Sequence, residues 1–514
     1  MNAIAKYISI LSIAAASVLT VSCSDAMLDE QLYSSLGTSN LPKNEKGAEQ
    51  LVLGIYSYLY ASDFQQFPIY GSDATSDQMF VNWGGVPEDG WAGQMNFLTF
   101  DQNHSVAQNA WQRAYIIIAQ CNEVVRHFGA LTSNTKIAEA VAEAKFWRAY
   151  CYYQLGLIYG NAPLVLEDTD MKNGVKQSPR EKLYQFVIDE LTPIDENNVL
   201  PHRRESSEWG RPTRWAVKTL LANLYLNKKD WPNALKYADD VMQHGEFTLM
   251  KEFQDVFDVE ENSELILTIG CVGEYYRGNL YAAQSLEGDL IAGLGIQGVS
   301  GSNGLGMAVP FYNTYDPKDK RIQDFDPVTK KGIAIHGYLN NVETGEPIYK
   351  GSGGEPLKVE EALNRVVILK YPVQENAMNG EWMTQDVVVF RLAEVMLTYA
   401  EAQNELGRPD LAIPRINDIR RRAGVDELPL DLSKDEVRDA VLAERGWELF
   451  MEGYRRHDLI RHGKLLESIR PKWEYYLDSP FGISGEEFRN LYPIPAAAMI
   501  LNPALKQNDG YNKL

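Results

Sequence analysis

The pattern of apolar and polar positions predicts long amphipathic helices in the first half of the chain and again towards its end. Apolar residues recur three or four positions apart, the spacing that places them on one helix face. Four early segments have this spacing, residues 44–61, 105–128, 134–159 and 180–194. Residues 64–100 sustain no period and are rich in Gly, Asp, Asn and aromatic residues. We expect a long, ordered, irregular loop there.

Two later segments have the pattern of helical hairpins, residues 213–244 and 387–424. In the first, Ala222 and Ala234 lie twelve residues apart across a polar turn, and Ala400 and Ala412 repeat this offset in the second. Small residues at this offset let two antiparallel helices approach closely, as in tetratricopeptide repeats. We therefore expect a mainly α-helical fold built on tetratricopeptide-like helix pairs.

The region between the two hairpins loses helical periodicity. Short β-branched runs at 265–269 and 365–369 alternate there with Gly, Ser, Asn and Pro, which is typical of small strands between turns. We expect an irregular, loop-rich insertion with small strands that carries the ligand site. The expected parts are a helical scaffold at 44–245 and 386–470, the insertion at 246–385 and an extended tail at 471–514.

Residues 1–22 have the pattern of a secretory signal, in which Lys6 precedes an apolar run over 7–21 and the small Ser22. The run is shorter than the roughly 20 residues of a membrane helix. Cys23 at the cleavage point resembles the cysteine of a bacterial lipobox, whose thiol is acylated. We expect a mature protein that begins at a lipidated Cys23; the alternative is an ordinary signal peptide cut nearby. Several acyl chains, at about 0.8 kcal/mol per buried methylene, give stable anchoring.

The charge balance narrows the possible partners. The chain has 49 Lys and Arg against 70 Asp and Glu, a net charge of −21, and removal of the signal with its one Lys gives −22. Such a charge repels phosphate backbones, so nucleic acid is not an expected partner. The aromatic content of 11% exceeds what a helical core needs, and sugar-binding surfaces are one use for the surplus. Cys121 and Cys151 lie in apolar helical patterns, which favours buried free thiols over a disulfide.

Five segments, in order along the chain, resemble signatures of the SusD/RagB family. The first two have the sequences CSDAMLD at 23–29 and AEAKFWRAY at 142–150, the latter followed by YGNAPL at 159–164. The others are 391–424, 444–461 and the ending YPIP with a later NP and QNDGY, within 492–511. Together they cover nearly the whole mature chain except 246–385.

This resemblance implies an outer-membrane lipoprotein that faces the medium. Family members bind glycans, or in some cases peptides or other nutrients, and cap a SusC-like, TonB-dependent barrel that imports them. The implied fold is four tetratricopeptide-like helix pairs with an irregular cap region. The hypothesis is therefore a lipid-anchored receptor that captures an oligosaccharide for a SusC-like transporter, without catalysis and without a cofactor. A receptor for peptide or another nutrient, a secreted glycoside hydrolase and a purely structural lid remain alternatives.

Charged and glycine-rich motifs in the chain have structural interpretations. Glu444, Glu448 and Glu452 are four residues apart and stack on one helix face, where Arg side chains are expected to bridge them in a scaffold network. Residues 293–298 match GxGxxG, but the following Gly and Ser residues do not begin a helix, so we expect a flexible loop that moves over ligand. We expect no zinc or other catalytic metal site, because no HExxH or Cys/His cluster is present, and a structural cation such as calcium in the acidic insertion stays open.

Aromatic residues in polar loops are the candidates for sugar contact, because a sugar ring needs a flat apolar face and hydrogen-bonding groups around it. Trp111, Trp147, Trp215 and Trp447 lie within helical patterns and are expected in the core. The candidate ligand-binding residues are Asp77, Asn82, Trp83, Trp91, Tyr275, Tyr276, Arg277 and Trp382. We expect at least two of the five loop aromatics among them to share one exposed patch.

Overall fold

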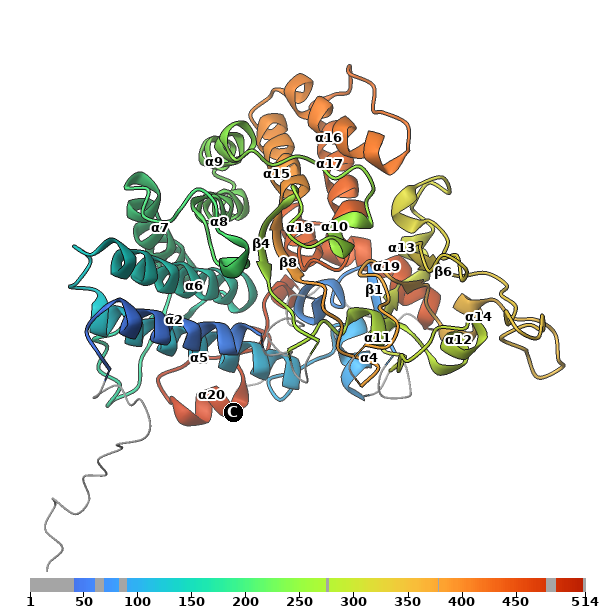
Figure 1. Ribbon diagram of the computed structural model, residues 1–514, viewed down its shortest axis with the longest axis horizontal. Helices are drawn as coiled ribbons and strands as arrows, with labels where there is room; N and C mark the ends of the chain where they lie inside the picture. The colour runs from blue at the N-terminus through green and yellow to red at the C-terminus, as the bar shows by residue number, and fades with distance from the viewer. Residues whose placement is uncertain are drawn as a thin grey trace, which may run out of the picture. The chain divides into compact units, whose positions relative to one another are not determined.

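The computed structural model describes residues 41–60, 69–82, 90–273, 277–377, 379–477 and 487–511. Residues 1–47 and 48–514 form separate units. Helices dominate the second unit, and within its described residues the strands occur only as short pairs (Figure 1). No helix among the described residues has the length and apolarity required to cross a membrane.

The early helices confirm the periodicity of the sequence. They are α2 (Glu45–Leu59), α5 (Ser105–Phe128), α6 (Thr135–Tyr159) and α7 (Arg180–Glu196), and α5, α6 and α7 pack against one another in chain order. Local signals define where they begin: Asn134 caps α6 by accepting hydrogen bonds from the backbone N–H groups of Lys136 and Ile137. Cys121 and Cys151 on α5 and α6 are buried free thiols, as expected.

The two predicted hairpins are present. The first is α8 (Arg214–Asn227) with α9 (Trp231–His244), and the second is α15 (Leu392–Glu405) with α16 (Pro409–Ala423). All four alanines at the twelve-residue offset are buried at their helix contacts, which confirms the small-residue interpretation. Helix α9 also packs against α15, so the two hairpins are neighbours although they lie far apart in sequence, with α9 ending at His244 and α15 beginning at Leu392.

The second hairpin was predicted to start at residue 387, but its first five residues form strand β8 (Val387–Arg391). Strand β4 (Leu265–Ile269) pairs with it in antiparallel orientation. The pairing explains the difference, because the β-branched run at the start of β8 has its partner about 120 residues earlier. It also ties the insertion to the scaffold at the entry to α15.

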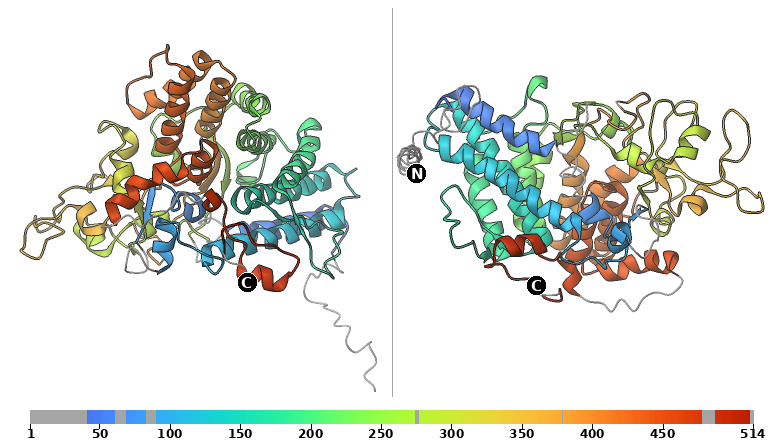
Figure 2. Two further views of the ribbon diagram at one scale, coloured as in Figure 1. Left: turned by 180° about the vertical axis from the view of Figure 1, so that it is seen from behind. Right: turned by 90° about the horizontal axis from the view of Figure 1, so that it is seen from below.

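The insertion contains more helix than its sequence pattern indicates. Its short helices are α10 (Asp255–Asp258), α11 (Tyr281–Ser285), α12 (Gly288–Gly293), α13 (Val309–Tyr312) and α14 (Val359–Leu363). Each spans less than two turns, too short for a 3.6-residue period to show. The insertion has its own apolar core around Leu286, Leu290 and Val367. Its helices α11, α12 and α14 lie on the side of the unit opposite α5–α7 (Figures 1 and 2).

Small antiparallel strand pairs complete the insertion and its neighbours. Strand β1 (Met79–Val81) pairs with β5 (Leu305–Met307), with Phe80 opposite Gly306. Strand β6 (Ala334–Ile335) pairs with β7 (Val367–Ile368), the only part of the predicted 365–369 run that forms a strand within the described residues. Outside the insertion, β2 (Ala162–Pro163) pairs with β3 (Gln177–Ser178).

Two segments expected to lack helix contain it. The predicted loop at 64–100 contains a π-helical turn (Ile69–Asp73), strand β1 and helix α4 (Gly90–Asn96).

The C-terminal scaffold helices are α17 (Lys434–Glu448), α18 (Arg455–Arg461) and α19 (Leu465–Tyr476). Because α19 passes through Pro471 and α20 (Ala496–Leu501) follows, the predicted extended tail is partly helical.

Candidate functional site

Glu444, Glu448 and Glu452 belong to a buried ionic network, as the sequence predicted. The three do not share one helix face, however, because α17 ends at Glu448 and Glu452 lies in the turn that follows. Arg391 at the end of β8 donates to Glu264, Glu448 and Glu452 over 2.8, 2.6 and 2.7 Å. Burial alone would raise the pKa of Glu448, but Arg422, Arg391 and Arg321 lower it well below its ordinary value. Arg391 and Lys370 likewise lower the pKa of Glu452. The buried carboxylates pair with cations on other elements, so they fasten the scaffold and do not face a substrate.

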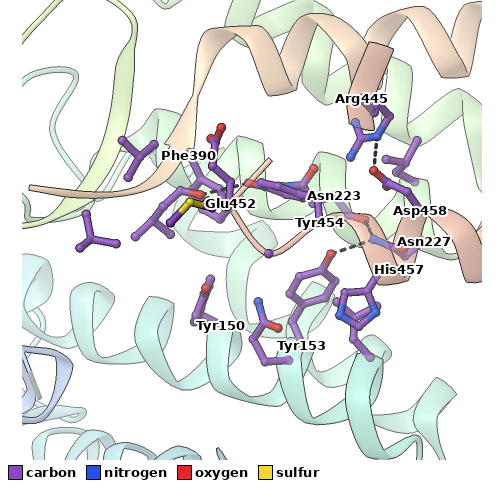
Figure 3. A pocket seen from close by; sticks show the side chains of 18 of the residues that line it. Tyr150, Tyr153, Asn223, Asn227, Phe390, Arg445, Glu452, Tyr454, His457 and Asp458 are labelled. Atoms are coloured by element: carbon purple, nitrogen blue, oxygen red, sulfur yellow. Dashed lines mark hydrogen bonds and ion pairs between the residues drawn. The ribbon is translucent and has the colours of Figure 1, made fainter. Parts of the chain in front are cut away.

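A small pocket lies inside the scaffold, between α6, α8, β8 and α18, and contains several polar side chains (Figure 3). Asp458 accepts from Arg445 at 2.8 Å, and the Tyr153 hydroxyl accepts from Asn227 at 2.8 Å. Desolvation and the charge of Arg456 lower the pKa of His457 to about 3. The volume of about 60 Å³ is far below the roughly 300 Å³ of a small-molecule site, so we do not assign a sugar to this pocket.

Three loops that are distant in sequence are joined by backbone hydrogen bonds beside β1. The Asn82 N–H donates to Gly304 at 2.8 Å, and the Ser300 N–H donates to Gly380 at 2.8 Å. Asn279 and Met383 exchange two backbone hydrogen bonds of 2.8 and 3.0 Å. The structure therefore brings together the end of β1, the glycine-rich segment and the chain around Trp382, which the sequence could not connect.

The joined loops present polar side chains to solvent. The exposed residues are Arg277, Gln297, Ser300, Asn379 and Thr384, and Asn82 is half-buried at the end of β1. We call these six residues the loop face. Hydroxyl, amide and guanidinium groups of this kind can satisfy the many donors and acceptors of a sugar.

Asp77 and Trp382, two of the candidate residues, lie beneath the surface. Asp77 is buried and accepts two hydrogen bonds from the Arg455 guanidinium, at 2.8 and 2.7 Å. Trp382 is 4% exposed and packs so closely on Gly278 that a Cβ there would lie 2.8 Å from that of Trp382. In this structure Asp77 fastens the segment before β1 to α18, and Trp382 supports the loop that carries Arg277.

Trp91 lies at the start of α4, half-buried and not part of the joined loops. Its Nε1–H donates to Ser105 Oγ at 2.6 Å, and its ring stacks on His104 with centroids 5.8 Å apart. Trp83, Tyr275, Tyr276 and the lipidation candidate Cys23 lie outside the described residues. The expected shared patch of loop aromatics thus stays a prediction for Trp83, Tyr275 and Tyr276.

The glycine-rich segment is packed, contrary to the expectation of a flexible loop. A Cβ at Gly301 would lie 2.5 Å from the carbonyl oxygen of Leu286, and one at Gly298 would lie 2.5 Å from Asn376 Oδ1. Gly298 also has a φ of +63°, a conformation that favours glycine. These glycines allow close approach of backbone, so the segment is part of the rigid support of the loop face.

Models of two related families match the chain. One, described as the SusD family, matches residues 293–511, and one described as starch-binding and associating with the outer membrane matches residues 27–226. Both models describe SusD-like proteins, so the chain is SusD-like over most of its length. The predicted tetratricopeptide-like, mainly α-helical architecture agrees with SusD-superfamily structures: a SusD homologue from Bacteroides thetaiotaomicron superposes with a TM-score of 0.74 at 21% identity, covering 94% of this chain and 100% of that one.

Known SusD-family proteins resemble the chain over most of its length. A SusD-like protein of Bacteroides ovatus is 25% identical, with 91% of this chain and 85% of the relative covered. The starch-binding protein SusD of Bacteroides thetaiotaomicron is 26% identical over 72% of each chain. Surface glycan-binding protein A of the same organism, solved with laminarihexaose, has a TM-score of 0.69 at 20% identity, covering 90% of this chain and 99% of that one.

Two buried cations fasten the segments next to β1 and β5 and were missed by sequence reasoning. Arg365 is buried against Gly306 and donates to the carbonyl groups of Leu305 and Ser285. Lys472 on α19 donates to the carbonyls of Ala74 and Ser76, both at 2.9 Å. Their partners are backbone groups on distant segments, so no local signal could have identified them.

Among the four helical tryptophans, Trp447 is only half-buried, whereas Trp111, Trp147 and Trp215 are in the core.

Proposed function

We propose that this SusD-like protein binds an oligosaccharide at the loop face. The observation that carries the proposal is that backbone hydrogen bonds join three distant loops, and that exposed polar side chains lie along the joined segments. A rigid surface of this kind binds without paying to order its own loops. The proposal is supported by the relatives named as starch-binding and as glycan-binding. Affinity is expected to be modest, because each protein–sugar hydrogen bond replaces one to water.

We propose further that the protein works at the outer face of the outer membrane, anchored through acylated Cys23. There it would deliver its glycan to a SusC-like, TonB-dependent transporter. The family resemblance supports this role, and the description of the model matching 27–226 refers to association with the outer membrane. Lipid chains on a single cysteine would hold the binding face at the surface while leaving the fold in water.

The charged groups favour binding over hydrolysis. A glycosidase needs two carboxyl groups about 5–10 Å apart on either side of a substrate, one of them with a raised pKa. Burial raises the pKa of Asp73 and of Glu394 to about 7, but both side chains are fully buried within the scaffold. Among the described residues, no cluster of three or more His, Cys, Asp or Glu side chains is arranged to hold a metal ion.

Affinity electrophoresis of the chain without residues 1–23 tests the proposal. Each native gel would contain one of amylopectin, laminarin, xyloglucan or xylan. The variant under test carries both Asn82→Ala and Arg277→Ala. Leu430→Ala, which removes an exposed side chain from the loop between α16 and α17, is the matched control. We expect one polysaccharide to retard the wild-type protein and the control without being degraded. The retardation of the double variant should be at least fivefold weaker than that of the control. Equal retardation of both variants would refute the loop face, and no retardation of any would favour a peptide or other nutrient.

A further inference from the structure

An apolar groove lies between α5, the segment that follows β2, and helix α20. Helix α20 packs along α5 (Figure 1), and the groove beside this contact has a volume of about 500 Å³. This volume falls within the range of roughly 300–1,000 Å³ that small-molecule sites occupy. None of the six loop-face residues lines it. We call this site the α5 groove.

The α5 groove is long and narrow. The α5 residues that line it lie on one helix face, namely Gln108, Trp111, Gln112, Tyr115, Ile116 and Ala119. At 1.5 Å per residue, the distance from Gln108 to Ala119 is about 16 Å. Dividing the volume by this length gives a cross-section of about 30 Å², or a width of about 6 Å. A helix with its side chains is about 10–12 Å across, so the groove accommodates a single extended chain but not a helix.

Hydrogen bonds hold the wall opposite α5 in place. The Tyr115 hydroxyl donates to the carbonyl oxygen of Pro163 at 2.8 Å, and the Asn502 amide donates to the carbonyl oxygen of Val175 at 2.8 Å. Gly174 has a φ of +70°, and a Cβ at this position would collide with the Asn502 side chain. The segment before Val175 therefore closes on the end of α20 because residue 174 is a glycine.

The lining of the groove carries no charge. Charged residues make up 23% of the chain, yet the described residues that line the groove include no Asp, Glu, Lys, Arg or His. Its polar side chains are those of Gln108, Gln112, Asn502 and Tyr115, and the rest are apolar. Burying a charged group or an unpaired peptide group against such walls is unfavourable. An extended peptide would bring N–H and C=O groups at every residue, whereas a hydrocarbon chain brings none.

Strongly exposed apolar side chains lie at the opening of the groove. Leu501 is 86% exposed and Met171 is 59% exposed, and both line the groove. An occupant that covers them removes apolar surface from water, which favours its binding. The exposed residues next to the opening carry both signs, Lys172 and Lys506 as well as Asp170, so they do not select the charge of a headgroup.

We infer that the α5 groove binds a monoacyl lipid by its acyl chain. One acyl chain spans half of the hydrocarbon core of a bilayer, which is about 30 Å thick, so its length of about 15 Å matches that of the groove. The chain is unbranched and uncharged, as the width and the lining require, and the headgroup stays in water at the opening. This activity is separate from the proposed binding of glycan at the loop face.

The fluorescence of cis-parinaric acid, which rises in apolar surroundings, measures this binding on the chain without residues 1–23. We expect saturable binding that palmitic acid and hexadecanol displace about equally, because the groove recognises the chain and not the headgroup. Shorter fatty acids should compete about fourfold less well for each methylene removed, since a buried methylene contributes about 0.8 kcal/mol.

Ala119→Phe places a ring in the groove at an exposed position of α5, so we expect at least tenfold weaker binding of cis-parinaric acid. Ala292→Phe makes the same substitution at an exposed position of α12, outside the groove, and is the matched control with unchanged binding. The melting temperature of each variant reports whether it is folded. If Ala119→Phe melts early, the chain-length series on the wild-type protein decides the question.

Three outcomes would overturn the inference. They are wild-type affinity in a folded Ala119→Phe variant, displacement that does not depend on chain length, and no saturable binding of cis-parinaric acid to the wild-type protein. The last outcome would favour an apolar segment of a partner protein as the occupant. Failure of the proposed glycan binding would not change these results, because the two sites share no residue.

Discussion

At the scale of single residues, helix α15 contains two buried glutamates with opposite electrostatic surroundings. Burial raises the pKa of Glu394 to about 7, although Arg445 and the Thr398 hydroxyl partly offset this. Burial also acts on Glu401, but Arg461 and His462 outweigh it and hold its pKa well below the ordinary range. Two turns of one helix thus separate a carboxyl group that prefers its proton from one that prefers its charge.

The first prediction concerns Glu394→Gln. Because its folded pKa is raised above the unfolded value of 4.5, the contribution of Glu394 to stability is fully present below that value and is lost as pH rises through about 7. The loss amounts to about 3 kcal/mol for a shift of this size. We therefore expect Glu394→Gln to be more stable than wild type at pH 8 and similar at pH 5, in urea unfolding followed by fluorescence.

Glu401→Gln is the matched comparison and should behave in the opposite way. Its lowered folded pKa contributes stability above pH 4.5, which is lost as pH falls through the folded value, so the variant should be less stable at pH 8. If both variants shift stability in the same direction at pH 8, the contrast between the two sites is wrong.

The second prediction concerns Arg391, whose guanidinium is completely buried among three carboxylates. Arg391→Met would leave Glu264, Glu448 and Glu452 short of a shared cation, so we expect a loss of about 3–5 kcal/mol in the free energy of unfolding. Arg421→Met removes an exposed arginine paired with Asp418 and Glu427 and should barely change the melting temperature. A small effect of Arg391→Met in calorimetry would show that the network is not required for the fold.

At the scale of elements, the third prediction compares two glycines of the insertion. Gly301→Ala places a Cβ 2.5 Å from the Leu286 carbonyl, so we expect a loss of about 1–3 kcal/mol and weaker glycan retardation, because the support of the loop face must shift. Gly288→Ala at the start of α12 meets nothing within 4 Å and should be neutral or slightly stabilising. Equal stability of the two variants would contradict the close packing of the segment.

The elements that could be predicted from the sequence are those whose signals are local. Helices such as α5 and α6 span six or more turns, and their periodicity identified them almost to the residue. Helices α11 and α13, of five and four residues, carry no such period. Strand β8 looked like the start of a helical hairpin because its partner β4 is far away in sequence.

Only part of the candidate site could likewise be predicted from the sequence. Its polar residues Asn82 and Arg277 could be proposed from loop composition, and the structure gives them a common support. The roles of Asp77 and Trp382 could not be predicted, because the partner Arg455 lies 378 residues from Asp77 and Gly278 lies about 100 residues from Trp382. Local composition therefore identified the region of the site but not which of its side chains are buried.

At the scale of the whole molecule, the helix pairs and the ionic network form the scaffold, and the insertion contributes every residue of the loop face except Asn82, which follows β1. The chain's net charge of −21 disfavours anionic ligands at long range when the ionic strength is low. Nothing in this arrangement requires a large conformational change on binding, since the joined loops are already fixed to one another. The central claim is thus that glycan binds to a preformed surface.

Hydrogen–deuterium exchange, read by mass spectrometry over the whole chain with and without the oligosaccharide matching the retarding polymer, tests this claim most directly. We expect the exchange in residues 297–304 and 377–384 to become slower on binding, and the exchange in helices α5–α9 to stay unchanged. Slowed exchange confined to the helical scaffold, with those two segments unaffected, would place the ligand elsewhere and contradict the account.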